Sequence, residues 1–525
     1  MSLAIIGAGA CGLVGLKEAL SHGLKPVCFE IDCDIGGLWN IDKKNYSSSV
    51  YNSTIINTSK EMMCFSDFPM PRDFPAYCPH HKVLEYFRFY CENFGLREYI
   101  AFKHRVELVE KSDDYEQTGD WKLTITNLKQ QRTYVELFNF VLVCNGHHGV
   151  PHIPHISGRN LFKGKCIHSQ DYFKNDNYVG KSVVIIGVGN SGCDMAVDMS
   201  RVCKKVYLVT RKGAWIFPRL HNGSLPFDMQ LNRFIRSVMP RYLSKLYIRS
   251  LIYKLADLDI YGLTPDHDVL TSHPTVNDDL IGRIAVGSIV VKPNIRSITE
   301  TGVQFIDNTS VDADVIAYCT GYSIGFPFLA SGIINTLDNN VELYKYVFPP
   351  HLKGSLAILG CVQPLGAINP IAELQARWVM MIFNKVLKLP TQPLMEKDIK
   401  MKREKMSRAF TKSRRHTIQV DYQNYSDEIS NLFDAKPRFL QLLFEDPRLF
   451  MHVLFGPLTP SQYRLFGPQR WPQARNSILN CWKNTKSPTQ TRVLTPKPYF
   501  LFLSHFGLFI IIGFFITYLV YICFT

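Results

Sequence analysis

Two stretches of the chain repeat one pattern of apolar and small residues. In the first, the apolar run at residues 3–6 is followed by three glycines with the spacing G-x-G-x-x-G, namely Gly7, Gly9 and Gly12. Leucines at helical spacing come next, and a second apolar run then ends at Glu30. This order predicts a β-strand, a tight turn, an α-helix and a second strand parallel to the first.

The glycines and the acid are the residue types that a dinucleotide site needs. Gly7 permits the tight turn, Gly9 lets the backbone approach a pyrophosphate, and Gly12 lets the helix pack closely on the strand. The N-terminus of the helix attracts the phosphate charges. Glu30 ends the second strand, where a carboxylate can accept hydrogen bonds from the hydroxyls of a ribose. This stretch therefore predicts a nucleotide-binding unit.

The same pattern returns at residues 182–211 with a different ending. Its glycines are Gly187, Gly189 and Gly192, but the second strand ends in Thr210, Arg211 and Lys212. Arg211 can pair with a 2′-phosphate, which a carboxylate would repel. The first site thus suits FAD or NAD, and the second suits NADPH. Together they predict an oxidoreductase with FAD in the first site, although Arg211 as a solvated charge at a strand end stays an alternative.

Further strand-like runs indicate that the chain returns to its first domain after the second glycine turn. They lie at 288–291, 302–305 and 313–318, and Gly321 follows, where it can return the backbone to the flavin. We therefore expect an α/β fold of two Rossmann-like domains, the second inserted in the first. The expected FAD-binding domain comprises residues 1–160 and 311–445. The expected NADPH-binding domain comprises residues 161–310, with an additional segment at 213–285.

Composition excludes several classes of protein and adds a basic region. The 525 residues are 46% hydrophobic and 20% charged, which excludes a disordered, collagen-like or disulfide-scaffold chain. Lys and Arg outnumber Asp and Glu by 59 to 45, and most of the excess lies between residues 381 and 498. Nucleic acid binds such charge, but the position beside an apolar tail favours an anionic membrane surface instead.

The C-terminal tail is the least polar part of the chain. Residues 498–525 contain no Asp, Glu, Lys or Arg, and residues 506–524 are long and apolar enough to enter a bilayer. Basic residues before this stretch predict that the preceding body stays in the cytosol. We expect 446–498 to be a basic membrane-proximal region and 499–525 to be a C-terminal transmembrane helix that anchors the chain in membrane lipid. A buried C-terminal helix is the alternative.

Several motifs outside the glycine turns are typical of one enzyme family. Residues 162–172 read F-x-G-x-x-x-H-x-x-x-Y, residues 36–39 read GGLW, and residues 319–322 read CTGY. With these motifs the chain resembles the flavin-containing monooxygenases from residue 3 to about residue 495. The apolar tail resembles that of the microsomal animal members. The resemblance therefore implies a tail-anchored protein of the endoplasmic reticulum membrane.

The resemblance also implies a reaction with O2, FAD and NADPH. In the family, NADPH reduces FAD, and the reduced flavin forms a C4a-hydroperoxide with O2. This species oxygenates soft nitrogen or sulfur nucleophiles, such as small lipophilic amines and sulfides, and the chemistry needs no metal. Asn57 would act catalytically at the junction of flavin and nicotinamide, or else cap a loop.

Other residues would bind the two cofactors by the same resemblance. Gly37, Leu38 and Trp39 would contact FAD together with the first glycine turn. Asn190 and Ser191 would contact NADPH, or else cap the helix that follows the second turn. Cys319 differs from the Ala or Thr that is common in the family. We expect this difference to affect the efficiency of the enzyme more than the class of reaction that it catalyses.

Two related reactions stay open from the sequence, whereas intact glycines in both turns count against a non-catalytic membrane- or partner-binding relative. The hydroperoxide can insert oxygen beside a ketone in a Baeyer–Villiger reaction, and an uncoupled enzyme would be an NADPH oxidase that releases hydrogen peroxide. A disulfide reductase needs a redox dithiol, but Cys28, five residues before Cys33, lies within a predicted strand. No motif for nucleic-acid binding is found, and the sequence leaves homo-oligomerisation open.

Overall fold

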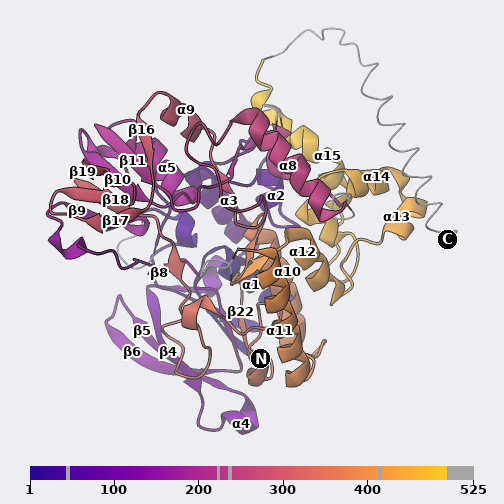
Figure 1. The fold of residues 1–525 in the computed structure, drawn as a ribbon. Helices are drawn as coiled ribbons and strands as arrows, with labels where there is room; N and C mark the ends of the chain where they lie inside the picture. Colours follow the sequence, from indigo (N-terminus) through magenta and orange to yellow (C-terminus); the bar gives the residue numbers. More distant parts are fainter. Residues whose placement is uncertain (43–47, 222–224, 235–238, 412–416, 493–525) are drawn as a thin grey trace.

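The computed structural model describes the chain up to residue 492, apart from residues 43–47, 222–224, 235–238 and 412–416 (Figure 1). It shows a mixed α/β fold with two five-stranded parallel sheets, as the sequence predicted. Within the described residues no helix is long and apolar enough to cross a membrane. The predicted anchor at 499–525 lies outside them.

The first sheet joins the N-terminal part of the chain to a strand from its later part. Its order is β22-β7-β1-β2-β3, with all neighbours parallel. The strands are β1 (Ser2–Ile6), β2 (Lys25–Glu30), β3 (Ile100–Phe102), β7 (Phe140–Val143) and β22 (Leu356–Ile358). Because both faces of this sheet are covered, β1 is apolar at consecutive positions rather than alternating ones.

Alternate residues of β1 enter two different cores. Leu3 and Ile5 pack in the core with α1 (Ala10–Ser21) and α10 (Ile368–Phe383). Ala4 and Ile6 pack in the core with an antiparallel sheet of β4 (His104–Lys111), β5 (Trp121–Asn127) and β6 (Arg132–Phe138). Helix α1 is therefore held firmly with its N-terminus at the carboxyl edge of the sheet.

The second sheet repeats this plan. Its order is β16-β11-β10-β20-β9, again parallel throughout. The strands are β9 (Lys165–His168), β10 (Ser182–Ile186), β11 (Lys205–Val209), β16 (Ile289–Lys292) and β20 (Val315–Tyr318). Helix α5 (Asn190–Met199) covers one face, and the antiparallel strands β17 (Ile295–Ile298), β18 (Gly302–Phe305) and β19 (Ser310–Asp312) cover the other.

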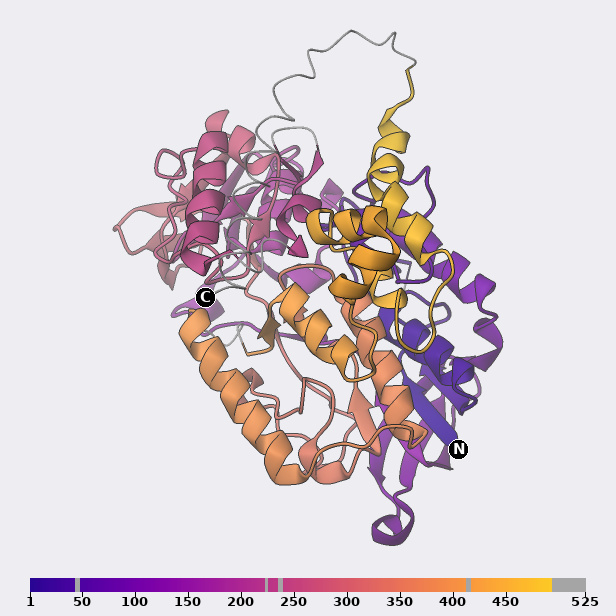
Figure 2. The same cartoon turned by 90° about the vertical axis from the view of Figure 1, so that its right-hand side faces the viewer.

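All strands of the second sheet lie between β7 and β22 in the chain. The two connections between the sheets pair with each other as antiparallel strands, β8 (Val150–Pro151) and β21 (Tyr322–Ser323). Figures 1 and 2 show the two sheets as separate bodies, with the C-terminal helices beside the first.

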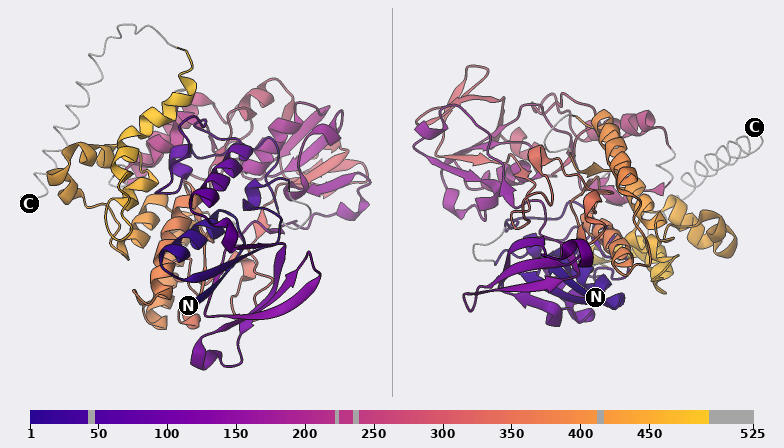
Figure 3. Two further views of the ribbon diagram at one scale, coloured as in Figure 1. Left: turned by 180° about the vertical axis from the view of Figure 1, so that it is seen from behind. Right: turned by 90° about the horizontal axis from the view of Figure 1, so that it is seen from below.

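The remaining elements surround the first sheet and bridge to the second. Figure 3 shows the C-terminal helices gathered on one side of the molecule and β4–β6 on another. The further elements are α2 (Lys60–Met63), α3 (His80–Asn93), β12 (Ile216–Phe217), α6 (Phe227–Leu231), α8 (Arg241–Leu255), β15 (Thr275–Val276), α11 (Gln392–Ala409), α12 (Tyr422–Asn431), α13 (Phe439–Glu445), α14 (Pro447–Phe455), η8 (Pro460–Arg464) and α15 (Ala474–Lys486).

Candidate functional site

The first glycine turn, between β1 and α1, is closed by backbone contacts that exclude side chains. Gly7 has φ +99°, and a Cβ there would lie 2.9 Å from the carbonyl oxygen of Cys144. A Cβ at Gly12 would lie 1.8 Å from the carbonyl oxygen of Gly7. Gly9 is the residue before α1, so its backbone lies beside the unpaired N–H groups at the start of the helix. The turn can receive a phosphate there.

A second loop closes over this turn. Gly37 begins the short 3-10 helix η1 (Gly37–Trp39), and a Cβ on it would lie 2.9 Å from the Cα of Gly9. The carbonyl of Leu38 accepts a hydrogen bond from the backbone N–H of Val50 at 2.9 Å, and Trp39 packs against the first core. The structure thus brings Gly9 and Gly37 into direct contact, and Leu38 and Trp39 follow in the same loop.

Glu30 lies where the prediction requires it, at the carboxyl end of β2 and against the first turn. Its carboxylate accepts hydrogen bonds from the backbone N–H of Ala8 at 2.6 Å and of Asp32 at 2.9 Å. Its residue surface is only 6% exposed. These bonds fix the carboxylate against the first glycine turn, and its contact with a ribose stays a prediction.

The second glycine turn has the same construction as the first. Gly187 has φ +114°, and a Cβ there would lie 2.6 Å from the carbonyl oxygen of Cys319. A Cβ at Gly192 would lie 1.9 Å from the carbonyl oxygen of Gly187. Gly189 precedes α5, just as Gly9 precedes α1.

The predicted polar residues of the second turn lie in different surroundings. Asn190 Oδ1 accepts a hydrogen bond from the backbone N–H of Val276 at 2.8 Å, so this side chain binds strand β15 rather than capping α5. Ser191 is the next residue of α5 and is half-buried. Arg211 follows β11 and is exposed, and the neighbouring Lys212 pairs with Asp266 at 3.4 Å. A basic strand end therefore stands beside this turn.

Gly321 lies in the connection by which the chain leaves the second sheet. It follows β20, and its carbonyl accepts a hydrogen bond from the backbone N–H of His152 at 2.9 Å. The same oxygen lies 3.1 Å from Nε2 of His168. Gly321 thus begins the segment that returns the chain toward the first sheet, and its contact with the flavin stays a prediction.

Asn57 lies in a loop that residues 213–285 hold from both sides. Its Oδ1 accepts a hydrogen bond from Nη2 of Arg219 at 2.9 Å. Two residues later, Ser59 donates through its backbone N–H and its hydroxyl to Oδ2 of Asp228, at 2.7 and 2.8 Å. Burial raises the pKa of Asp228. Sequence reasoning missed Arg219 and Asp228 as partners of this loop, because no motif marks them.

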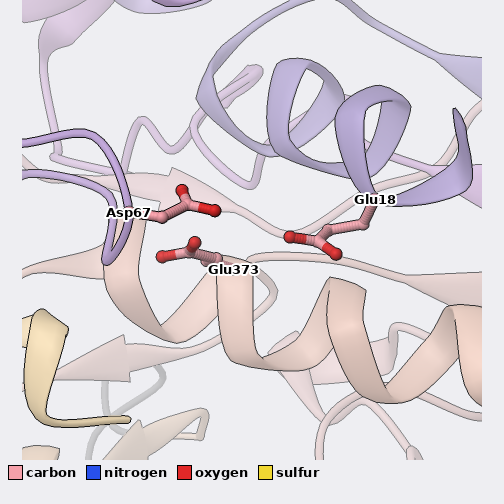
Figure 4. Close-up of side chains that lie close together, drawn as sticks. All are labelled: Glu18, Asp67 and Glu373. Atoms are coloured by element: carbon pink, nitrogen blue, oxygen red, sulfur yellow. The ribbon is translucent and has the colours of Figure 1, made fainter. Parts of the chain in front are cut away.

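Three carboxylates, Glu18, Asp67 and Glu373, meet in the core away from the glycine turns (Figure 4). Nη2 of Arg464 lies 3.0, 3.0 and 2.7 Å from oxygens of these three groups, respectively. Lys17 adds a second cation, 2.8 Å from Glu18 and 2.6 Å from Asp67. The cluster therefore ties η8 to α1 and α10, and two protein cations offset most of the negative charge of its three carboxylates.

Comparison with known proteins identifies the family. The profile of the family described as flavin-binding monooxygenase-like matches residues 1–523. The chain is 46% identical to mouse flavin-containing monooxygenase 5, and 42% identical to rat dimethylaniline monooxygenase [N-oxide-forming] 2. Each alignment covers 94% of both chains.

Solved structures share the fold at lower identity. S-allyl-L-cysteine S-oxygenase from Allium sativum is 24% identical with a TM-score of 0.63, over 93% of this chain and 98% of that one. A cyclohexanone monooxygenase is 16% identical with a TM-score of 0.61, over 82% and 97%. From the family profile and the sequence relatives, this chain belongs to the flavin-binding monooxygenase-like family and is a flavin-dependent monooxygenase.

Proposed function

We propose that the protein uses FAD, NADPH and O2 to oxygenate soft nitrogen or sulfur atoms of small lipophilic molecules. The observation that carries this proposal is the pair of equivalent glycine turns, one at the carboxyl edge of each parallel sheet. The first turn is accompanied by Glu30 and the second by Arg211, a difference that favours FAD at the first and NADPH at the second. The N-oxide-forming rat relative supports nitrogen as a target atom.

The residues of the chain bind, orient and shield, while the cofactors supply the redox chemistry. When bound at the first turn, FAD would supply the acceptance of a hydride from NADPH and the activation of O2. Gly9 and Gly37 pack so closely that a Cβ on Gly37 would lie 2.9 Å from the Cα of Gly9, and their backbones would hold the pyrophosphate at the N-terminus of α1. Asn57 presents an amide in the loop between the first sheet and residues 213–285. Holding this loop closed keeps water from the reacting oxygen.

The finer layout belongs to the same proposal. Residues 1–160 and 311–445 would form the FAD-binding domain, and residues 161–310 the NADPH-binding domain. Residues 446–498 would lie at the membrane, and 499–525 would anchor the protein in the endoplasmic reticulum with its catalytic body in the cytosol. The charge-free tail and the basic excess before it support this placement.

The test uses the full chain, purified in detergent. FAD content is measured first, and NADPH consumption is then followed with a tertiary amine, a sulfide or a ketone. We expect bound FAD and one N-oxide or S-oxide per NADPH consumed. Ester from the ketone alone would replace the proposal by a Baeyer–Villiger function, and peroxide equal to the NADPH consumed would replace it by an oxidase. A chain that binds no FAD would refute the proposal.

A further inference from the structure

Arg219 connects residues 213–285 to the loop that carries Asn57. Its Nε donates to the carbonyl of Ile56 at 3.1 Å, and its Nη2 donates to the carbonyl of Ile55 at 3.3 Å. Nη2 also donates to Oδ1 of Asn57 at 2.9 Å. One guanidinium therefore holds three consecutive residues. Its side chain is 12% exposed, so water competes weakly for these bonds.

The position of this guanidinium is itself fixed. Nη1 of Arg219 pairs with Oδ2 of Asp278 at 2.8 Å, and the backbone N–H of Arg219 donates to Oδ1 of the same residue at 2.8 Å. The carbonyl of Arg219 accepts hydrogen bonds from the hydroxyl of Tyr77 at 2.5 Å and from the backbone N–H of Phe227 at 2.8 Å. Other residues thus fix both the backbone and the side chain of Arg219, so its contact with Asn57 is pre-organised.

The contact determines which way the amide of Asn57 is turned. A guanidinium only donates hydrogen bonds, so the amide oxygen must face it and the amide Nδ2 must face away. The opposite turn would set two donors against each other and lose a charge-assisted bond. Such a bond corresponds to about a ten- to hundredfold preference for one orientation. Asn57 therefore presents Nδ2 as a donor to whatever binds on its other side.

We propose that Arg219 is a positioning residue, which orients the amide of Asn57 so that its Nδ2 donates to the bound cofactor or to the oxygen that it carries. This inference rests on the proposed function, because it requires FAD at the first sheet. It assigns to the segment 213–285 a direct part in coupling NADPH consumption to oxygenation. An oxygen atom of the bound cofactor, or one that it carries, would accept a hydrogen bond from Nδ2 of Asn57. If the amide were reversed, Oδ1 of Asn57 would face that oxygen and repel it.

The experiment compares Arg219→Met, Asn57→Ala and the double variant in the full holoenzyme. Without Arg219 the two amide orientations become similarly populated, so the product formed per NADPH should fall about twofold while peroxide rises. The double variant should be no worse than Asn57→Ala, because Arg219 acts through Asn57. Arg219→Lys keeps a positive charge and one donating nitrogen, so it should restore part of the coupling. The control is Arg249→Met, an exposed arginine on α8 of the same segment.

A second readout does not depend on turnover. The visible absorption spectrum of the oxidised flavin, and its change on titration with NADP⁺, should be altered in the same way by Arg219→Met and Asn57→Ala. Additive losses in the double variant, or unchanged coupling in both Arg219 variants, would overturn the inference. If Asn57→Ala itself leaves coupling and spectrum unchanged, Arg219 has no amide to orient and the inference is overturned too. A wild-type protein without FAD would instead overturn the proposed function.

Discussion

Replacing Arg464 by Met should destabilise the protein, and the loss should grow as the pH rises. Arg464 is 2% exposed and its Nη2 lies within 3.0 Å of Glu18, Asp67 and Glu373. Its Nε also donates to the hydroxyl of Ser66 at 2.6 Å. Methionine fills much of the same volume but provides no charge, so Glu18 and Asp67 would keep Lys17 as a partner, whereas the buried Glu373 would lose its ion pair with Arg464.

The expected loss is large because a buried charge is left without its partner. Breaking a buried ion pair from one side costs about 3–5 kcal/mol of the free energy of unfolding. Burial alone would raise the pKa of Glu18, but Lys17 and Arg464 outweigh it and hold that pKa well below its usual range. In the native protein the carboxylate of Glu18 therefore stabilises the fold at pH values above the pKa that it has in the unfolded chain. This stabilisation is lost as the pH falls toward the lower pKa of the folded state.

Removing the guanidinium weakens this contribution. Burial of Glu18 would then be opposed mainly by Lys17, so the pKa of Glu18 would rise, and the stability that its low pKa provides would be lost mainly at the higher pH, where the carboxylate is charged. Thermal unfolding with bound flavin, measured at pH 5 and pH 8, should show the larger deficit at pH 8. Arg475→Met, which removes an exposed ion pair with Asp446, should cost about 1 kcal/mol or less. An equal deficit at both pH values would refute the electrostatic reasoning.

Four further outcomes are expected from the site and the tail. Arg211→Glu should raise the KM for NADPH about tenfold or more and reduce the preference of the enzyme for NADPH over NADH, measured by steady-state kinetics with both nucleotides. Glu30→Gln should weaken FAD binding to the apoprotein about three- to thirtyfold, measured by quenching of flavin fluorescence. Gly37→Ala should lose FAD because its Cβ would meet Gly9, whereas Gly282→Ala, with open space at its Cβ, should retain it in the purified protein. Deletion of residues 499–525 should move the protein from the membrane fraction to the supernatant, and unchanged fractionation would contradict the anchor.

The parallel sheets could be predicted because their determinants are local. The run from β1 through Gly7 and Gly9 to Glu30 has one strand, one turn and one helix within thirty residues, and each glycine is required by a contact inside that unit. The second unit repeats the same contacts around Gly187. The positions of the antiparallel sheets β4–β6 and β17–β19 could not be predicted in this way. The apolar pattern of a short strand is local and does not indicate which parallel sheet the strand packs against.

The partners of Asn57 could not be predicted, and the reason is their distance along the chain. Arg219 is 162 residues from Asn57, and Asp228 is 169 residues from Ser59. In the sequence, Arg219 is one of several basic residues in a segment without a motif, whereas in the fold it is fixed by Asp278 and directed at one amide. A long-range hydrogen bond leaves no periodic signal, so only the folded chain shows it. Since Val276 of the same segment also donates to Asn190 in the second glycine turn, one insertion contacts residues of both predicted cofactor sites.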